Sequence, residues 1–326
     1  MKTEKLASNA ADGLILLHKN QGLTSFESLG FIKKALSTRK AGHTGTLDKF
    51  ASGLLIVLTG HAVKLASLFS YCKKEYEGRI RFGIETDTLD PEGAIIGEAE
   101  IPSLDTVEKI LADFTGEILQ SPPAYSAVHL NGKRAYELAR QGQTPEIKKR
   151  PVTIYSLELA SWEPPFASIK VCCSAGTYIR SLARDIALAA KSRAHLNALV
   201  RTKIGSFNLS DAFDPAKFSI GNFDNFSRNI AEMREAVVSA LHPITPDIFS
   251  MLNLPWVCLE NNLNGEEQIR AISYGQSLDN ALLNKLINNL PYAPAAGIFA
   301  NISDKVEIIA LLEQLNSKWK YAHVFN

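Results

Sequence analysis

A glycine-rich segment near the N-terminus combines residue types that could do chemistry. Gly42-His43-Thr44-Gly45-Thr46-Leu47-Asp48 places an imidazole and a carboxylate shortly before the apolar run Gly53–Leu58. Glycine-rich loops often cradle phosphates, but this one lacks the Lys-Ser/Thr ending of a P-loop and the glycine spacing of a dinucleotide-binding turn. Nucleotide hydrolysis is therefore disfavoured. Taken alone, the segment also fits a structural interpretation, in which Asp48 caps a helix and the glycines form turns.

Three residues elsewhere are further candidates for a site. Arg180 falls in the first turn of an expected helix, where the helix dipole disfavours a cation, so we expect an anionic partner in the fold or in a ligand. Asp90 lies in the stretch Thr86–Gly93, which lacks EF-hand spacing, and we favour an organising role over metal binding, the alternative being a plain turn. Tyr76 is in phase with the apolar face of an alternating segment, where a tyrosine without further context is a core residue.

Hydrophobic periodicity predicts the elements that position these residues. A capping box at Thr24 and Glu27 opens a helix from about Ser25 to Leu36, and alternation around Tyr76 predicts a half-buried strand. The other predicted elements are a helix capped by Ser103 and ended by Gly116, strands at Val152–Leu159 and Ser168–Ser174, a helix with the stripe Ile179, Leu182, Ile186 and Ala189, and a helix at about Phe226–Leu241. This irregular mixture favours an α+β sheet domain over a doubly wound fold.

Length and composition exclude several classes of protein. The 326 residues are 46% hydrophobic and 21% charged, which argues for about two folded domains and against disordered, collagenous or disulfide-rich chains. The longest apolar runs are too short to cross a bilayer, and Glu4 and Asp12 interrupt any signal-peptide core, so we expect a cytoplasmic protein without membrane contact. The four cysteines form neither a disulfide framework nor paired Cys/His ligands, so we expect no metal site.

The charges are unevenly divided along a chain of net charge +1. Eight acids and five bases follow Pro246, giving −3, which leaves +4 on the first 246 residues. Two basic clusters occur in that part: Lys33, Lys34, Arg39 and Lys40, and Lys133, Arg134, Arg140, Lys148, Lys149 and Arg150. Clustered cations of this kind suit a phosphate backbone, and solvated faces are the alternative.

Seven stretches, taken in order, resemble the motifs of the TruB family of tRNA pseudouridine-55 synthases. They cover about residues 13 to 210 and comprise Lys19 with Gly22–Ser25, Gly42–Leu55, Lys74-Glu75-Tyr76, Thr86–Gly93, Ser121–Ala127 with Gly132–Glu137, Gly176–Leu182, and Ala194–Leu199 with Arg201–Phe207. The sequence departs from the family pattern at His18, Asn20, Lys49 and Val200, where the family usually has Asp, Pro, Pro and Arg. None of these departures removes a reacting group.

The resemblance implies isomerisation of uridine on a pseudouridine synthase fold, with a mixed, largely antiparallel sheet flanked by helices. The glycosidic bond breaks, uracil turns, and a carbon–carbon bond forms to the same ribose, so neither cofactor nor energy source is needed. Asp48 resembles the family nucleophile, Arg180 its cationic partner, and Tyr76 the tyrosine that stacks on the base and is a candidate final proton acceptor. The implied substrate-binding residues are His43, which fills the space of the extruded base, Tyr178 and Leu199 as walls, Asp90 and Lys19.

The last part of the chain resembles the small PUA-like domains of bacterial family members. We expect a catalytic domain at 1–245 and a mainly-β domain at 246–326, divided at Pro243–Pro246. Short strands are expected at Leu254–Pro255, Ile272–Gln276, Gly297–Phe299 and Ile308–Leu311. Because this part is acidic, we expect few RNA contacts there, and a stabilising or partner-binding appendage is the alternative.

The leading hypothesis is a stand-alone enzyme whose partner is the T-arm of tRNA, without an obligatory protein partner. Two alternatives remain open: a pseudouridine synthase for another RNA, and an RNA-binding or tRNA-folding protein without catalysis. The presence of Asp48, Tyr76 and Arg180 argues against the last of these.

Overall fold

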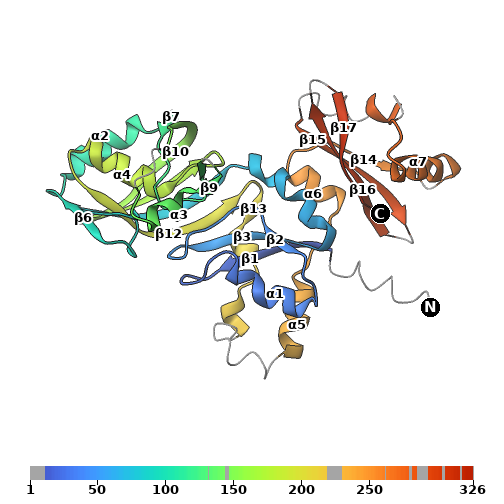
Figure 1. Cartoon of the computed structure of the whole chain (residues 1–326), viewed down its shortest axis with the longest axis horizontal. Helices are drawn as coiled ribbons and strands as arrows, with labels where there is room; N and C mark the ends of the chain where they lie inside the picture. The colour runs from blue at the N-terminus through green and yellow to red at the C-terminus, as the bar shows by residue number, and fades with distance from the viewer. Residues whose placement is uncertain are drawn as a thin grey trace.

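The computed structural model describes residues 12–130, 132–143, 147–218, 230–260, 262–278, 281–284, 293–302, 305–315 and 318–325. It shows a large sheet with helices, joined to a smaller sheet formed by the C-terminal part (Figure 1). None of the helices in the described ranges is long and apolar enough to cross a membrane.

The large sheet has nine strands and is antiparallel at every pairing except one. Seven strands follow the order β1-β3-β12-β4-β11-β10-β7, β2 pairs with β3, and β13 pairs with β12. The single parallel pairing joins β12 to β3, so β12 connects the two halves of the sheet. The strands are β1 (Gly13–Lys19), β2 (Ala41–His43), β3 (Ser52–Thr59), β4 (Lys74–Phe82), β7 (Gly116–Gln120), β10 (Arg150–Glu163), β11 (Phe166–Cys173), β12 (Ala194–Ile204) and β13 (Phe207–Asn208).

Two helices cover one face of the half that contains β4, β11 and β10. In α2 (Leu104–Asp113) the residues Val107 and Leu111 are buried, and α4 (Ile179–Ala189) buries Ile179, Leu182 and Ile186 in the same core cluster. The strands alternate accordingly, so that in β4 every second residue from Lys74 to Phe82 is buried. Ser103 caps α2 by accepting a hydrogen bond from the Thr106 amide at 3.3 Å, as predicted.

The half that contains β1 and β3 is covered on both faces. On one side lie α1 (Gly30–Ala35) and α5 (Ile230–Ser239), and on the other a long 3-10 segment (Gly60–Tyr71) and the C-terminal part. Burial on both faces explains why these strands read as continuous apolar runs without alternation. Three shorter 3-10 segments complete this part, Glu27–Leu29, Leu209–Asp211 and Pro215–Phe218.

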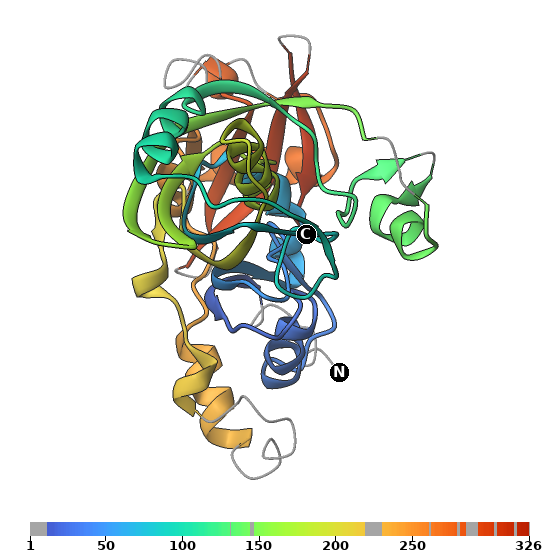
Figure 2. The same ribbon diagram turned by 90° about the vertical axis from the view of Figure 1, so that its left-hand side faces the viewer.

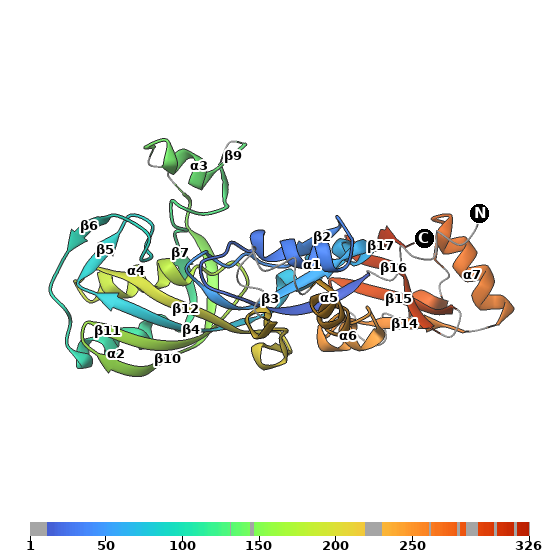
Figure 3. The same ribbon diagram turned by 90° about the horizontal axis from the view of Figure 1, so that it is seen from below.

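Two small hairpins leave the sheet. One is formed by β5 (Ile84–Thr86) and β6 (Ile95–Glu98), and the other by β8 (His129–Leu130) and β9 (Lys133–Arg134), followed by α3 (Ala135–Arg140). The second hairpin and α3 stand well away from the sheet, as the side views show (Figures 2 and 3). This projecting arm carries part of the second basic cluster.

The C-terminal sheet has the order β14-β15-β16-β17. Its strands are β14 (Trp256–Leu259), β15 (Ala295–Ile302), β16 (Lys305–Leu315) and β17 (Lys318–Val324), with α6 (Pro246–Met251) and α7 (Leu263–Ser273) beside them. Phe249 of α6 and Phe299 of β15 meet edge to face at 5.2 Å between ring centroids, and both share a hydrophobic cluster with Leu54, Leu58 and Phe69. The two sheets are thereby joined through a common core.

The α+β class, the mixed and largely antiparallel sheet and the small β-rich C-terminal part are confirmed. The Thr24–Glu27 capping box is also present, with Thr24 N to Glu27 Oε2 at 2.8 Å, although the first turn behind it is a 3-10 turn. The predicted helix Phe226–Leu241 is found as α5, and its first residues lie outside the described ranges.

Three sequence-based interpretations are wrong. Leu254–Pro255 is not a strand, because pairing begins only at Trp256 with β14. The expected strand at Ile272–Gln276 is instead the end of α7, because Ile272 is one apolar residue of a helical stripe and Gly275 supplies a positive φ of 67° just beyond it. Asp48 does not cap a helix, since the chain passes from the loop 44–51 directly into β3.

Candidate active site

The loop that carries Asp48 connects β2 to β3. The strand pairing sets His43 opposite Val57, and the amide of Thr44 adds a hydrogen bond to the carbonyl of Ile56 at 3.1 Å. The hydroxyl of buried Ser25 accepts from the Leu47 amide at 2.8 Å and donates to the Leu47 carbonyl at 3.0 Å. Both ends of the loop and its middle are therefore fixed before any substrate binds.

Two buried cations, Arg201 and Lys19, bind backbone carbonyls of this loop and of the residues next to it. Arg201, only 1% exposed, donates from Nε to Leu54 O at 2.8 Å and from one terminal nitrogen to Gly45 O at 3.0 Å. Lys19 is fully buried and donates to Ala51 O at 2.6 Å and to Asn20 O at 3.0 Å. Burial lowers the pKa of Lys19 to about 8, against a smaller raising effect of the Asp48 charge.

The side chain of Lys19 is buried behind the loop. Its ammonium group donates hydrogen bonds to backbone carbonyls of the loop and of the residue beside it. We propose that its part in the site is to position the loop, in place of the substrate contact expected from the family resemblance.

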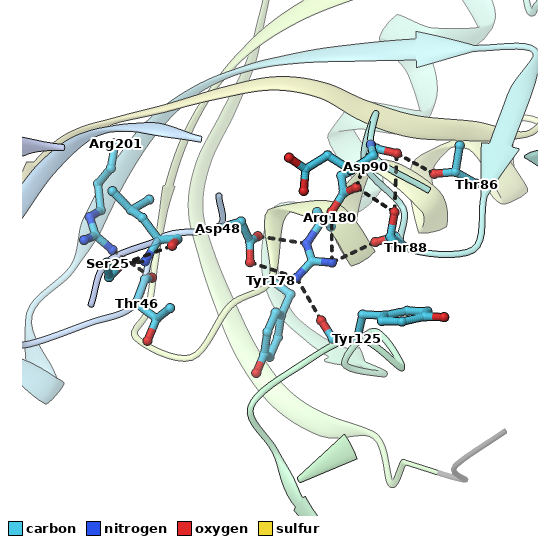
Figure 4. A network of polar contacts seen from close by, with 12 residues as sticks. Ser25, Thr46, Asp48, Thr86, Thr88, Asp90, Tyr125, Tyr178, Arg180 and Arg201 are labelled. Carbon is cyan, nitrogen blue, oxygen red and sulfur yellow. Dashed lines mark hydrogen bonds and ion pairs between the residues drawn. The ribbon is translucent and has the colours of Figure 1, made fainter. Parts of the chain in front are cut away.

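Asp48 and Arg180 form a two-point ion pair at the centre of the site (Figure 4). Arg180 Nε lies 2.8 Å from Asp48 Oδ2, and a terminal nitrogen donates to Asp48 Oδ1 at 2.9 Å. Arg180 is 5% exposed, whereas the Asp48 side chain is 34% exposed. The guanidinium therefore backs the carboxylate and balances its charge while the carboxylate keeps access to solvent. The anionic partner expected for a cation at the start of α4 is Asp48 together with Asp90.

The turn that follows β5 supplies the rest of the Arg180 environment. The second terminal nitrogen of Arg180 donates to Thr88 O at 2.7 Å and lies 3.4 Å from Asp90 Oδ2. Asp90 is itself buried and accepts at Oδ1 from the Thr88 hydroxyl at 2.6 Å and from the Glu92 amide at 3.1 Å. Asp90 thus organises the turn and fixes the guanidinium, away from the open side of the site.

Two aromatic residues border the ion pair. The backbone of Tyr178 is clamped by buried Gln120, whose Oε1 accepts from Tyr178 N at 2.8 Å and whose Nε2 donates to Tyr178 O at 3.1 Å. Arg150 lies over the Tyr178 ring, 5.0 Å from its centroid. In the segment that precedes β8, the carbonyl of Tyr125 accepts from Arg180 at 3.0 Å. Figure 4 shows both side chains next to Arg180.

Tyr76 and Leu199 form an apolar floor beside the Asp48 loop. They lie on neighbouring strands β4 and β12 and share a cluster with Leu47 and Ile179. Burial raises the pKa of the Tyr76 phenol, while the charge of Arg201 and a hydrogen bond from it act in the opposite direction. Tyr76 is therefore a neutral phenol in the free protein at neutral pH.

His43 lies at the edge of the same loop and is half-buried. Burial and the nearby Arg201 charge lower the pKa of its imidazole, so the ring is neutral at pH 7. Its Nδ1 is buried without a hydrogen-bond partner among the described residues. A neutral, partly open imidazole of this kind suits stacking better than ion pairing.

The structure brings together Asp48, Arg180, Asp90, Tyr178, Tyr76 and Leu199, and adds residues that the sequence reasoning missed. Arg201 and Gln120 were not singled out, although Arg201 stands in one of the matched motifs. Their effect is on the backbone of other residues, which no residue type or spacing reveals. No group of three His, Cys, Asp or Glu side chains that could hold a metal ion occurs within the described ranges.

Comparisons with known proteins identify this arrangement. A family model described as "TruB family pseudouridylate synthase (N terminal domain)" matches residues 33–179. The chain is also 50% identical over 204 residues to "tRNA pseudouridine synthase B" of Borreliella burgdorferi (strain ZS7), covering 62% of this chain and 72% of that protein. The chain belongs to the TruB family.

Another curated relative agrees with this assignment, and a solved structure shares the fold. "tRNA pseudouridine synthase B" of Treponema denticola is 45% identical over 234 residues, 66% of this chain and 64% of that protein. The "Crystal Structure of a Cbf5-Nop10-Gar1 Complex" includes a chain with a TM-score of 0.63 at 24% identity, covering 98% of this chain and 85% of that one. At such identity the likeness concerns the fold, and it extends over the C-terminal sheet as well as the large one.

Proposed function

We propose that this protein is a tRNA pseudouridine synthase that isomerises uridine 55 in the T-loop, with Asp48 as the nucleophile. The observation that carries the proposal is the two-point ion pair between a half-open carboxylate and a buried guanidinium. It lies beside an apolar floor of Tyr76 and Leu199, on a chain of the TruB family. These are the groups that an isomerisation at a ribose carbon needs.

Each side chain has a distinct part in the reaction. The ionised Asp48 carboxylate attacks or stabilises C1′ of the ribose as the bond from C1′ to N1 breaks, and the departing uracil takes that electron pair. The base then turns over Tyr76 and Leu199, and C5 bonds to C1′ as the Asp48 carboxylate leaves that carbon and is regenerated. One proton is lost from C5 and one is gained at N1, so the composition is unchanged. We assign both transfers to Tyr76, whose neutral phenol gives its proton to N1 and, as the phenolate, takes the proton from C5.

The positioning groups support these steps without reacting. Arg180 keeps Asp48 oriented, and Arg180 is itself oriented by Asp90 Oδ2 at 3.4 Å and by the Thr88 carbonyl at 2.7 Å. Tyr178 walls the site and is fixed by Gln120. A uridine in a folded loop must leave its stack to reach Asp48, which costs a few kcal/mol, and the neutral ring of His43 is suited to fill the vacated space.

Incubation with unmodified tRNA transcript, followed by mapping of pseudouridine, tests the proposal. We expect product at position 55 and none from Asp48→Asn, whose RNA affinity should stay within about tenfold because phosphate contacts supply most of the binding. Substantial product from Asp48→Asn would refute the assigned nucleophile. Product at other RNA positions only would favour a different target, and tight binding without any product would favour a non-catalytic RNA-binding protein.

The division into domains and the cellular setting belong to the same proposal. We assign catalysis to residues 1–245 and auxiliary RNA contacts to a PUA-like domain at 246–326, and we place the enzyme in the cytoplasm with its tRNA substrate. The acidic balance of the C-terminal part supports only a small share in RNA binding.

A further inference from the structure

An exposed aromatic ring lies beside the Asp48 loop and takes no part in the site described above. Phe26 is 70% exposed, although the residue before it, Ser25, is buried. Ser25 exchanges two hydrogen bonds with Leu47, the neighbour of Asp48. Phe26 and Asp48 are thus each one residue away from the same fixed contact, and the ring of Phe26 is exposed to solvent beside it.

One cation lies over this ring, and a second lies near the neighbouring residue Glu27. Lys33 places its ammonium group 4.8 Å from the Phe26 ring centroid. Lys49 is exposed and directly follows Asp48. It lies close enough to Glu27 to help lower the pKa of that carboxyl, after the larger effect of the hydrogen bonds from Thr24. That carboxylate is engaged by the Thr24 amide at 2.8 Å, so it is committed to the helix cap.

We propose that Phe26, Lys33 and Lys49 form a second RNA contact, in which an unpaired base next to the target uridine stacks on Phe26. The phosphates of the same strand would meet Lys33 and Lys49. An exposed aromatic ring offers a surface to any base, and adjacent cations neutralise the backbone that follows it. This inference rests on the proposed function only in taking an RNA loop as the substrate.

The position of the contact gives it a purpose in catalysis. A base held on Phe26 fixes the strand on one side of the target, while the target uridine itself must swing toward Asp48. The stacking energy of the held base then partly offsets the cost of unstacking its neighbour. Lys49 stands where the family usually has proline, so this chain adds a cation at the point nearest the nucleophile.

Binding of a T-arm RNA hairpin tests the stacking contact. All proteins carry Asp48→Asn, so that the RNA is not converted during the measurement. We expect Phe26→Ala to weaken the affinity about fivefold or more, Phe26→Trp to retain it, and the control Tyr155→Ala to leave it unchanged. Tyr155 is 44% exposed on β10 and has Lys73 4.0 Å from its ring centroid, which makes it a matched pair of aromatic ring and cation outside the Asp48 loop and the C-terminal part. Equal affinity of Phe26→Ala and its parent would overturn the proposal.

A set of hairpins with single abasic positions identifies the stacked base. Removal of the base at one unpaired position should weaken binding of the parent protein. The same removal should have no further effect on Phe26→Ala, because the ring and the base contribute to binding only as a pair. Additive losses at every abasic position would refute stacking. Unchanged thermal unfolding of Phe26→Ala excludes a folding defect as the cause.

The salt dependence of binding tests the two cations. Lys33→Gln and Lys49→Gln should each lower the slope of log K against log [salt] by about 0.7 to 0.9, whereas Phe26→Ala should leave it unchanged. Lys109→Gln, an exposed lysine on α2, is the control. Unaltered slopes for both variants would show that Lys33 and Lys49 do not contact the RNA phosphates. Failure of the proposed function would look different, since the protein with Asp48 intact would then bind the hairpin without making pseudouridine.

Discussion

The buried ammonium of Lys19 should make the protein more stable as the pH rises above neutrality. The pKa of Lys19 is lowered from 10.5 to about 8 by burial, so between these values the unfolded chain binds more protons than the folded one. Stability then increases with pH across this window. A difference of about 2.5 pKa units corresponds to a destabilisation of roughly 3 kcal/mol at pH 7, of which about 2 kcal/mol should be recovered by pH 9.5.

Urea unfolding of the wild type and of Lys19→Met at pH 7.0, 8.0, 9.0 and 9.5 measures this effect. Subtracting the two free energies of unfolding cancels every other titrating group that both proteins share. We expect the difference, wild type minus Lys19→Met, to rise by about 2 kcal/mol over the range. The exposed Lys109→Met should give a flat difference. A difference that stays constant or falls with pH would show that Lys19 is not charged and buried as the structure has it.

Three further predictions concern the site and its scaffold. Arg180→Met leaves Asp48 and Asp90 without their cation and should cost about 3–5 kcal/mol in urea unfolding and remove product formation; a stable, active variant would contradict the ion-pair assignment. Tyr76→Phe keeps the ring and removes the hydroxyl, and single-turnover kinetics should show a loss of about 10² or more, whereas full activity would restrict Tyr76 to stacking. Gly53→Ala adds a Cβ 2.4 Å from Arg201 O at a backbone φ of +115°. The free energy of unfolding of this variant should therefore fall by at least about 3 kcal/mol. An unchanged thermal midpoint would count against the close approach of β3 and β12.

Helices and strands that bury only one face were the easiest to predict from the sequence. α2, α4 and β4 each bury a single face, so their spacing and the places of Arg180 and Tyr76 could be read directly. Strands β1 and β3 carry no such alternation because both of their faces are covered. Strand β17, with its mostly half-buried pattern, was not predicted at all.

The contacts behind the loop could not be predicted for a different reason. Lys19 and Arg201 bind backbone carbonyls, and a carbonyl is present at every residue. Only the three-dimensional path of the loop decides which carbonyls come within reach. The family resemblance therefore identified Lys19 as part of the site but could not show that it is buried and bound to these carbonyls.

The central place of β12 also determines when the enzyme becomes active during its synthesis. Asp48 and Arg180 are 132 residues apart in the chain, and Leu199 and Arg201 come later still. Because β12 pairs with both β3 and β4, neither half of the sheet can complete the site before residue 204 has left the ribosome. At about 5–20 residues per second, this delay after Asp48 appears is on the order of ten seconds. A chain released early, short of β12, is a catalytically silent fragment with exposed strand edges, and its removal falls to the chaperones and proteases of the cell.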